Sequence, residues 1–216
     1  MLNFVAAAAL ASTAIIFPPG GAPGDDAPPP GVIYVKLLTV NGSGCKPGTA
    51  AVAVSDDRQA FTVSYSDYTA KVGPGSGTSD FRKNCQLNLE VHVPQGFTYG
   101  IAKADYRGYG KLERGASGTE KANYYFQGMS ETTYKSHTWN GPLDDNWEAN
   151  DEVPVGAVAY APCGEKRNFN INTELRVNAG TSGTRATSFM VMDSTDASLK
   201  TTYHFAWKVC PGGGGR

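Results

Sequence analysis

The sequence predicts an all-β protein, folded as a two-sheet antiparallel β-sandwich. The clearest observation is the stretch Asn84–Pro94, in which apolar and polar side chains alternate. Such a period of two gives a strand one buried face and one wet face. Stretches of the same kind recur along the chain between turn signals, and no segment has the pattern of an amphipathic helix. Composition agrees, because 26 glycines and a charged fraction of 18% suit short strands joined by glycine-rich turns. A jelly-roll-like sandwich is one form, a single closed barrel is the alternative, and the strand order stays open.

The N-terminus has the features of a secretory signal peptide. Phe4–Ile16 is an alanine-rich apolar run that is too short to span a bilayer. Ser12 and Ala14 are small residues at the −3 and −1 positions of a cleavage site, so residues 1–14 are predicted to be removed. A buried N-terminal strand is the alternative. No second hydrophobic segment is long enough to anchor the mature chain in a membrane.

The mature chain is expected to contain one domain. A Pro/Gly-rich leader over residues 15–31 lacks core-forming side chains. One β-sandwich domain is predicted over residues 32–210, and residues 211–216 are predicted to be a flexible tail.

In the first half of the domain, turn signals separate the predicted strands. Asn41-Gly42-Ser43-Gly44 is one turn, and Asp56-Asp57-Arg58 is another. The two aspartates could also be metal or catalytic carboxylates, but a hairpin turn is favoured because strand patterns flank them. Arg107-Gly108-Tyr109-Gly110 is expected to bend or bulge its strand. The strands expected here are Val32–Val40, Ala51–Val54, Ala60–Tyr65, Tyr68–Val72, Asn84–Pro94 and Phe97–Tyr109.

In the second half, Asn168–Val177 repeats the clean alternation of the first strands. Gly141–Glu152 is predicted to be an acidic surface loop, and Asp193–Asp196 a turn. Thr132–Trp139 alternates weakly and is expected at a sheet edge. Val153–Tyr160 is an apolar run that closes at Pro162-Cys163-Gly164. The strands expected here are Tyr124–Gly128, Thr132–Trp139, Asn168–Val177, Thr187–Met192 and Thr201–Cys210.

The four cysteines predict two disulfides, because an even count in a secreted chain indicates paired thiols. Three connectivities are possible. Cys45–Cys85 and Cys163–Cys210 are favoured, because each joins the end of one predicted strand to the edge of another. A metal site is the alternative, but the chain has no Cys-x-x-Cys and no neighbouring pair of histidines.

Several short motifs resemble a secreted family known as domain of unknown function 4360. They include Val40–Cys45, Ala60–Tyr65, Lys83–Leu87, Pro94–Tyr99, Asp105–Tyr109, Pro162–Gly164 and Trp207–Cys210. The resemblance runs from about Val32 to Cys210. It implies a small secreted protein of the kind found in fungi and some filamentous bacteria. It transfers no activity and names no catalytic residue.

No catalytic or cofactor motif is present. The chain lacks Gly-x-Ser-x-Gly and His-Glu-x-x-His, and its glycine-rich loops are not followed by helices. No catalytic residue and no cofactor are therefore predicted. A small hydrolase acting on cell-wall polysaccharide remains the alternative function, because the two acids of a glycosidase can lie far apart in sequence.

A cluster of acids provides weak candidates for a metal site. Carboxylate oxygens at this density could bind calcium, but the order of an EF-hand loop is absent, and acidic surface segments are usually solvated. The five candidates are Asp144, Asp145, Glu148, Asp151 and Glu152.

Four aromatic residues are the candidates for ligand binding. Tyr106 and Tyr109 flank the expected bend, and Trp139 and Trp147 bracket the turn at Gly141-Pro142. Rigid rings on loops give a large contact area for little lost entropy. The alternative is that the tryptophans plug one end of the sandwich. The favoured function is a non-enzymatic extracellular or cell-wall-associated protein, a monomer, that binds a glycan or a host surface component. With a net charge of −1, no nucleic-acid partner is expected.

Asn41-Gly42-Ser43 is an acceptor sequence for N-linked glycosylation. If the source is eukaryotic, Asn41 is therefore predicted to carry a glycan. The alternative is an unmodified turn asparagine, because the nearby Cys45 can hinder the transferase.

Overall fold

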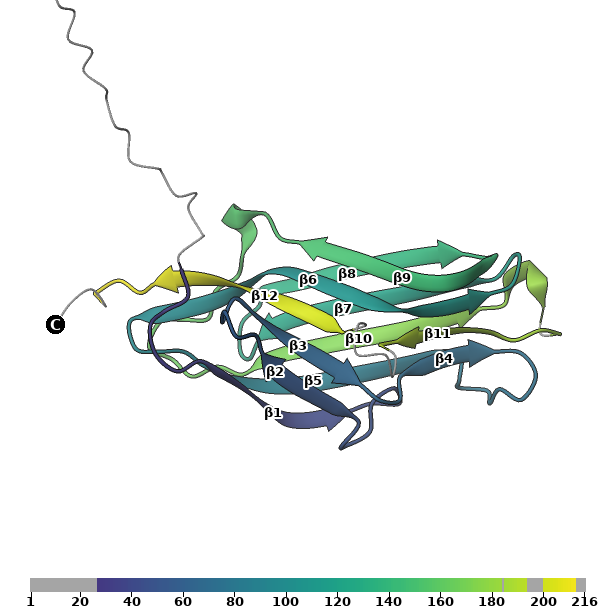
Figure 1. The fold of residues 1–216 in the computed structure, drawn as a ribbon, viewed down its shortest axis with the longest axis horizontal. Helices are drawn as coiled ribbons and strands as arrows, with labels where there is room; N and C mark the ends of the chain where they lie inside the picture. The colour runs from purple at the N-terminus through teal and green to yellow at the C-terminus, as the bar shows by residue number, and fades with distance from the viewer. Residues whose placement is uncertain (1–26, 184, 194–199, 213–216) are drawn as a thin grey trace, which may run out of the picture.

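A computed structural model describes residues 27–183, 185–193 and 200–212. Two antiparallel sheets lie face to face and form an elongated sandwich (Figure 1). The fold is thus the predicted two-sheet sandwich and not a closed barrel. The predicted signal peptide, most of the leader, residues 194–196 of the predicted turn and the end of the tail lie outside the described residues.

The first sheet has five strands in the order β1-β5-β10-β7-β8. Its central pairings are regular, since Phe169–Asn178 pairs without interruption with β7 and over most of its length with β5. Inward side chains on these strands are mostly apolar, and outward ones are mostly amides, hydroxyls and charges. The strands are β1 (Tyr34–Asn41), β5 (Arg82–His92), β10 (Phe169–Asn178), β7 (Ser117–Phe126) and β8 (Thr132–Asn140).

The second sheet has seven strands, built around the long strand β6 (Phe97–Leu112). One edge of β6 pairs with β12 and then with β11, while its other edge pairs with β9. The order is β2-β3-β12-β6-β11-β4, with β9 beside β6. The other strands are β2 (Ala50–Val54), β3 (Ala60–Tyr65), β4 (Thr69–Val72), β9 (Leu143–Glu152), β11 (Ser188–Met192) and β12 (Thr201–Val209).

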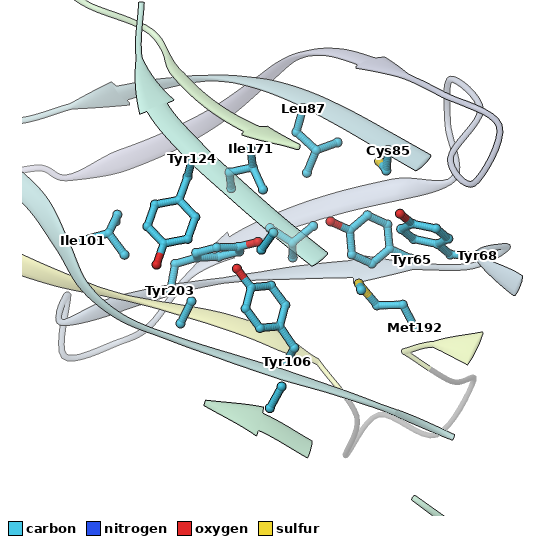
Figure 2. Packing of buried hydrophobic residues seen from close by; sticks show 14 of the residues in the cluster. Tyr65, Tyr68, Cys85, Leu87, Ile101, Tyr106, Tyr124, Ile171, Met192 and Tyr203 are labelled. Carbon is cyan, nitrogen blue, oxygen red and sulfur yellow. The ribbon is translucent and has the colours of Figure 1, made fainter. Parts of the chain in front are cut away.

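The core between the sheets is unusually rich in tyrosine. Tyr106 and Tyr203 are fully buried with ring centroids 5.9 Å apart, and Tyr124 packs 6.4 Å from Tyr203 (Figure 2). Aromatic pairs at these distances and near-perpendicular angles stabilise a core beyond their buried area.

Two disulfides tie the ends of strands together with the predicted pairing. Cys45–Cys85 joins the segment after β1 to β5, with Cα atoms 5.3 Å apart. Cys163–Cys210 joins the loop before β10 to the end of β12, with Cα atoms 5.8 Å apart.

Residues 141–152 form strand β9 and its turn, so the prediction of an acidic loop is wrong. Trp147, Ala149 and Asp151 point inward, while Glu148, Asn150 and Glu152 alternate with them on the outer face. Glu148 lies 3.3 Å from Arg107 and Asp144 lies 3.7 Å from Lys111, both on the paired strand β6. Cross-strand pairs of opposite charge support a strand whose sequence alone has the composition of a loop.

One other boundary also differs from prediction. β7 begins at Ser117, well before the predicted start at Tyr124. Its inward positions Gly118, Glu120 and Ala122 are small or charged, so the sequence there lacks the apolar alternation that predicts a strand. The apolar run after β9 contains the short 3-10 helix Val155–Ala157, whose residues are exposed. A second 3-10 helix covers Gly180–Ser182.

Candidate functional site on the outer face of the five-stranded sheet

One row of amide side chains crosses the outer face of the five-stranded sheet. The strand register places Gln86 of β5 opposite Asn172 of β10, and Asn172 opposite Asn123 of β7. Asn123 in turn lies opposite Tyr134 of β8, and Asn41 of β1 lies opposite Gln86. We call these five residues the amide row. Because side chains of paired residues project from the same face of a sheet, the row is continuous across all five strands.

Much of the hydrogen-bonding capacity of the amide row is unused within the described part of the chain. The carboxamides of Gln86 and Asn172 make no side-chain hydrogen bond to described residues. In the neighbouring row, by contrast, Asn88 Nδ2 donates to Asn170 Oδ1 at 2.7 Å, and Asn168 Nδ2 donates to Asn88 Oδ1 at 2.9 Å. Asn123 Nδ2 likewise donates to Thr132 Oγ1 at 2.5 Å and to Thr133 O at 3.3 Å, so its donors are already used. A carboxamide offers two N–H donors and one acceptor oxygen, and the row presents those of Gln86 and Asn172.

An open pocket of about 260 Å³ lies over the amide row. Gln86, Asn172, Asn123 and Tyr134 all line it. The side chain of Tyr134 is 61% exposed, which makes its ring a free apolar surface at the β8 side. Polar groups that converge in a hollow beside an aromatic ring are typical of a binding site for a small polar molecule.

Positive charge borders one side of this pocket. Arg82 Nε donates to Glu174 Oε2 at 2.5 Å, Arg176 lies 3.2 Å from Glu174 Oε1, and Lys121 lies 4.0 Å from the same oxygen. The three cations outnumber the single carboxylate that holds them together. The border therefore carries a local positive excess.

The structure places two of the four predicted ligand-binding aromatics inside the core. Tyr106 is 0% exposed and Trp147 is 1% exposed, so the prediction that their rings face outward is wrong. The stretch Arg107–Gly110 continues β6 without a bend, which keeps Tyr106 on an inward position. A Cβ on Gly108 would lie 2.4 Å from the Trp147 ring, so this glycine provides the space that the indole fills.

The other two aromatics do not form a shared platform. Trp139 is partly buried, and its ring centroid lies 4.9 Å from that of Trp147. The two tryptophans therefore pack against each other, in agreement with the alternative that they plug the sandwich. Tyr109 faces outward from β6, and its hydroxyl donates to Asp144.

The five acidic metal candidates do not converge either. Asp144, Asp145, Glu148 and Glu152 are exposed along β9, whereas Asp151 faces the core. Asp151 Oδ1 lies 2.6 Å from His137 Nε2. Among the described residues, no group of three or more His, Cys, Asp or Glu side chains has the arrangement of a metal site.

The core contains a carboxyl group that sequence reasoning missed. Glu120 is 0% exposed, and neither of its carboxyl oxygens has a hydrogen-bond partner among the described residues. Burial, followed by the nearby charge of Asp151, raises the pKa of Glu120 well above its ordinary value. Its inward position on β7 was the available signal, but the weak pattern of that strand hid it.

A second pocket of about 350 Å³ lies at one end of the sandwich, beside the Cys163–Cys210 bridge. Val91, Pro94 and Pro162 give it a partly apolar lining. Arg167 also lines it, but this side chain donates to Gln127 O at 2.8 Å and to Glu165 Oε2 at 2.9 Å. The amide row is therefore the richer set of unpaired polar groups.

These features define a disulfide-linked β-sandwich with a polar, amide-lined outer face. The chain belongs to the family described as "Domain of unknown function (DUF4360)", whose model matches residues 32–210. A relative from Arthroderma benhamiae, described as an "Uncharacterized secreted protein", is 41% identical over 187 residues. The match covers 87% of this chain and 76% of that protein. Secretion of this chain is supported by this relative and agrees with the two disulfides.

A comparison with solved structures found the enzymatically active domain of tailspike protein 4 from bacteriophage CBA120. The match has a TM-score of 0.23 and 11% identity, and it covers 83% of this chain but 19% of the tailspike chain. A likeness at this level carries no argument about function. In the described part of the chain, no helix has the length and apolar character needed to cross a membrane.

Proposed function

We propose that this protein is an extracellular, non-enzymatic glycan-binding protein, and that the amide row is its binding surface. The observation that carries the proposal is the continuous row of Gln86, Asn172 and Asn123 beside the exposed ring of Tyr134. Sugar hydroxyls both donate and accept hydrogen bonds, as carboxamides do, so one carboxamide can bind two neighbouring hydroxyls. A tyrosine ring can pack against the C–H face of a sugar, where it offers rigid apolar area.

The size of the surface suits an extended oligosaccharide. Neighbouring strands lie about 4.8 Å apart, so the row from Gln86 to Tyr134 spans about 14 Å. The cations at the border, Arg82, Lys121 and Arg176, favour sugars that carry a carboxylate. We therefore expect oligosaccharides with uronic acids to bind more tightly than neutral ones of equal length, by a margin that shrinks as salt is added.

Calorimetric titration with defined neutral and acidic oligosaccharides tests this function. Replacing Asn172 or Tyr134 by alanine should weaken binding roughly tenfold, because each change removes about one direct interaction with the sugar. Melting temperatures should stay close to that of the wild type, since truncating these outward-facing side chains disturbs the core little.

Asn140→Ala is the matched control. Asn140 is an exposed asparagine of β8 that lies outside the amide row, six residues beyond Tyr134. It should bind like the wild type. If Asn172→Ala and Tyr134→Ala bind like Asn140→Ala, the amide row is not the binding surface. Release of new reducing ends during incubation would instead favour the alternative, a hydrolase acting on wall polysaccharide.

A further inference from the structure

The acceptor asparagine for N-glycosylation lies at one end of the amide row. Asn41 is the last residue of the edge strand β1, is exposed, and pairs with Gln86. At a strand spacing of about 4.8 Å, Gln86 is one step from Asn41, and Tyr134 is four steps or about 19 Å away. A sugar attached to Asn41 therefore starts beside Gln86 and far from Tyr134.

Asn84 of β5 holds the acceptor sequence in the folded protein. The Ser43 hydroxyl donates to Asn84 Oδ1 at 2.9 Å and accepts from the Asn84 N–H at 3.1 Å. The Gly44 N–H donates to Asn84 O at 2.8 Å. Gly42 has φ +149°, and a Cβ there would lie 2.1 Å from Asn84 O, so only glycine fits this close approach. In the folded protein these contacts hold the Ser43 hydroxyl against β5, while the side chain of Asn41 stays exposed.

We propose that Asn41 carries an N-linked glycan in protein secreted by a eukaryotic cell, and that its first sugars cover the Gln86 end of the amide row. In the modification step, Asn41 Nδ2 attacks the anomeric carbon of an oligosaccharide linked to a polyprenyl diphosphate. The N-glycosidic bond forms, the bond to the diphosphate breaks with its electron pair leaving on the diphosphate, and Nδ2 loses one proton. One consequence rests on the proposed function. Because the attached glycan covers the Gln86 end, a free oligosaccharide from solution binds the amide row from the Tyr134 end.

Mass spectrometry of peptides from protein secreted by a eukaryotic host tests the modification itself. The wild type should carry a glycan on Asn41, and both Asn41→Gln and Ser43→Ala should carry none. Ser43→Thr is the matched control, because it keeps an acceptor sequence and should stay glycosylated. An unmodified Asn41 in secreted wild-type protein would overturn the proposal.

Contact between the glycan and the row can be measured without any added ligand. NMR spectra of the glycosylated protein and of the same sequence made without a glycan in a bacterial host should differ at the side-chain amide of Gln86. They should agree at Tyr134. Identical Gln86 signals in the two forms would overturn the covering of the row while leaving the modification intact.

Binding of the tightest oligosaccharide from the calorimetric series then tests the consequence. Asn41→Gln should bind it roughly threefold more tightly or better than the glycosylated wild type, because the Gln86 end is open. Equal affinities would overturn the shielding role. If no form of the protein binds any oligosaccharide, the proposed function fails, and the mass and NMR results still decide the modification and its contact with the row.

Discussion

At the scale of single residues, the most unusual group is the carboxyl of Glu120. A fully buried carboxyl without partners among the described residues is costly when ionised, so the folded protein keeps it protonated. The buried tyrosines Tyr106 and Tyr203 interact electrostatically with it, and burial raises their pKa values as well. Asp193 is another buried acid, and burial raises its pKa to about 7 although its carboxylate accepts a hydrogen bond from the Tyr65 N–H.

Glu120→Gln should flatten the pH dependence of stability. In the wild type, the folded state keeps a proton that the unfolded state loses above the ordinary pKa of 4.5. The unfolding free energy therefore falls as pH rises past this value, by up to about 1.4 kcal/mol per pH unit for this one group. Glutamine has no such proton to lose. The unfolding free energy of the variant, relative to that of the wild type, should therefore be higher at pH 7 than at pH 4.

Urea unfolding at a series of pH values between 4 and 7 measures this difference. Glu131→Gln is the control, because Glu131 is an exposed glutamate whose replacement should leave the wild-type curve unchanged. If the slopes for wild type and Glu120→Gln coincide, Glu120 is not protonated in the folded protein.

At the scale of elements, β6 and β9 show how the sandwich closes on one side. The inward glycines of β6 make room for Trp147 of β9, while the outward cations of β6 pair with the acids of β9. The same strand pair thus combines a packed inner face with a charged outer face. Trp147 acts as a core residue, in agreement with the plug alternative and not with a ligand-binding role.

Trp147→Ala should lower the unfolding free energy by about 3–5 kcal/mol, because it leaves a large cavity between β6 and the neighbouring strands. Trp139→Ala should cost less, since Trp139 is only partly buried. Chemical unfolding of both variants measures the two losses. A Trp147→Ala protein as stable as the wild type would show that the indole does not fill the core as described.

Loss of the Cys45–Cys85 bridge should also destabilise the fold. The bridge closes a loop with a sequence separation of 40, for which the chain-entropy estimate is about 4 kcal/mol. The double replacement Cys45→Ala/Cys85→Ala should therefore lower the midpoint of urea unfolding. A midpoint equal to that of the wild type would show that strand pairing between β1 and β5 suffices without the bridge.

At the scale of the whole molecule, the sequence predicts the sandwich well wherever one face of a strand is apolar. Asn168–Val177 was within one residue of β10 at each end, because its inward positions are bulky and its outward ones polar. β9 and the first half of β7 escaped prediction, because charge pairs and neighbouring strands stabilise them more than their own pattern does.

The candidate site could not be predicted from the sequence in the same way. Gln86, Asn123 and Asn172 belong to three separate strands, and each is an ordinary outward residue in its own segment. Only the strand order and register place them in one row. The prediction that Tyr106 and Trp147 face outward was wrong because it relied on local turn signals, and these do not indicate which face of a sheet a ring occupies.

The most direct test of the amide row as a glycan-binding surface is an NMR titration of the unglycosylated Asn41→Gln protein with the oligosaccharide that binds most tightly, because a glycan on Asn41 would cover Gln86. We predict that the side-chain amide signals of Gln86, Asn172 and Asn123 shift in proportion to occupancy, together with the ring signals of Tyr134, while Gly96 and Arg167 in the second pocket stay unchanged. Shifts confined to the second pocket, or no shift in the amide row at saturation, would contradict the account.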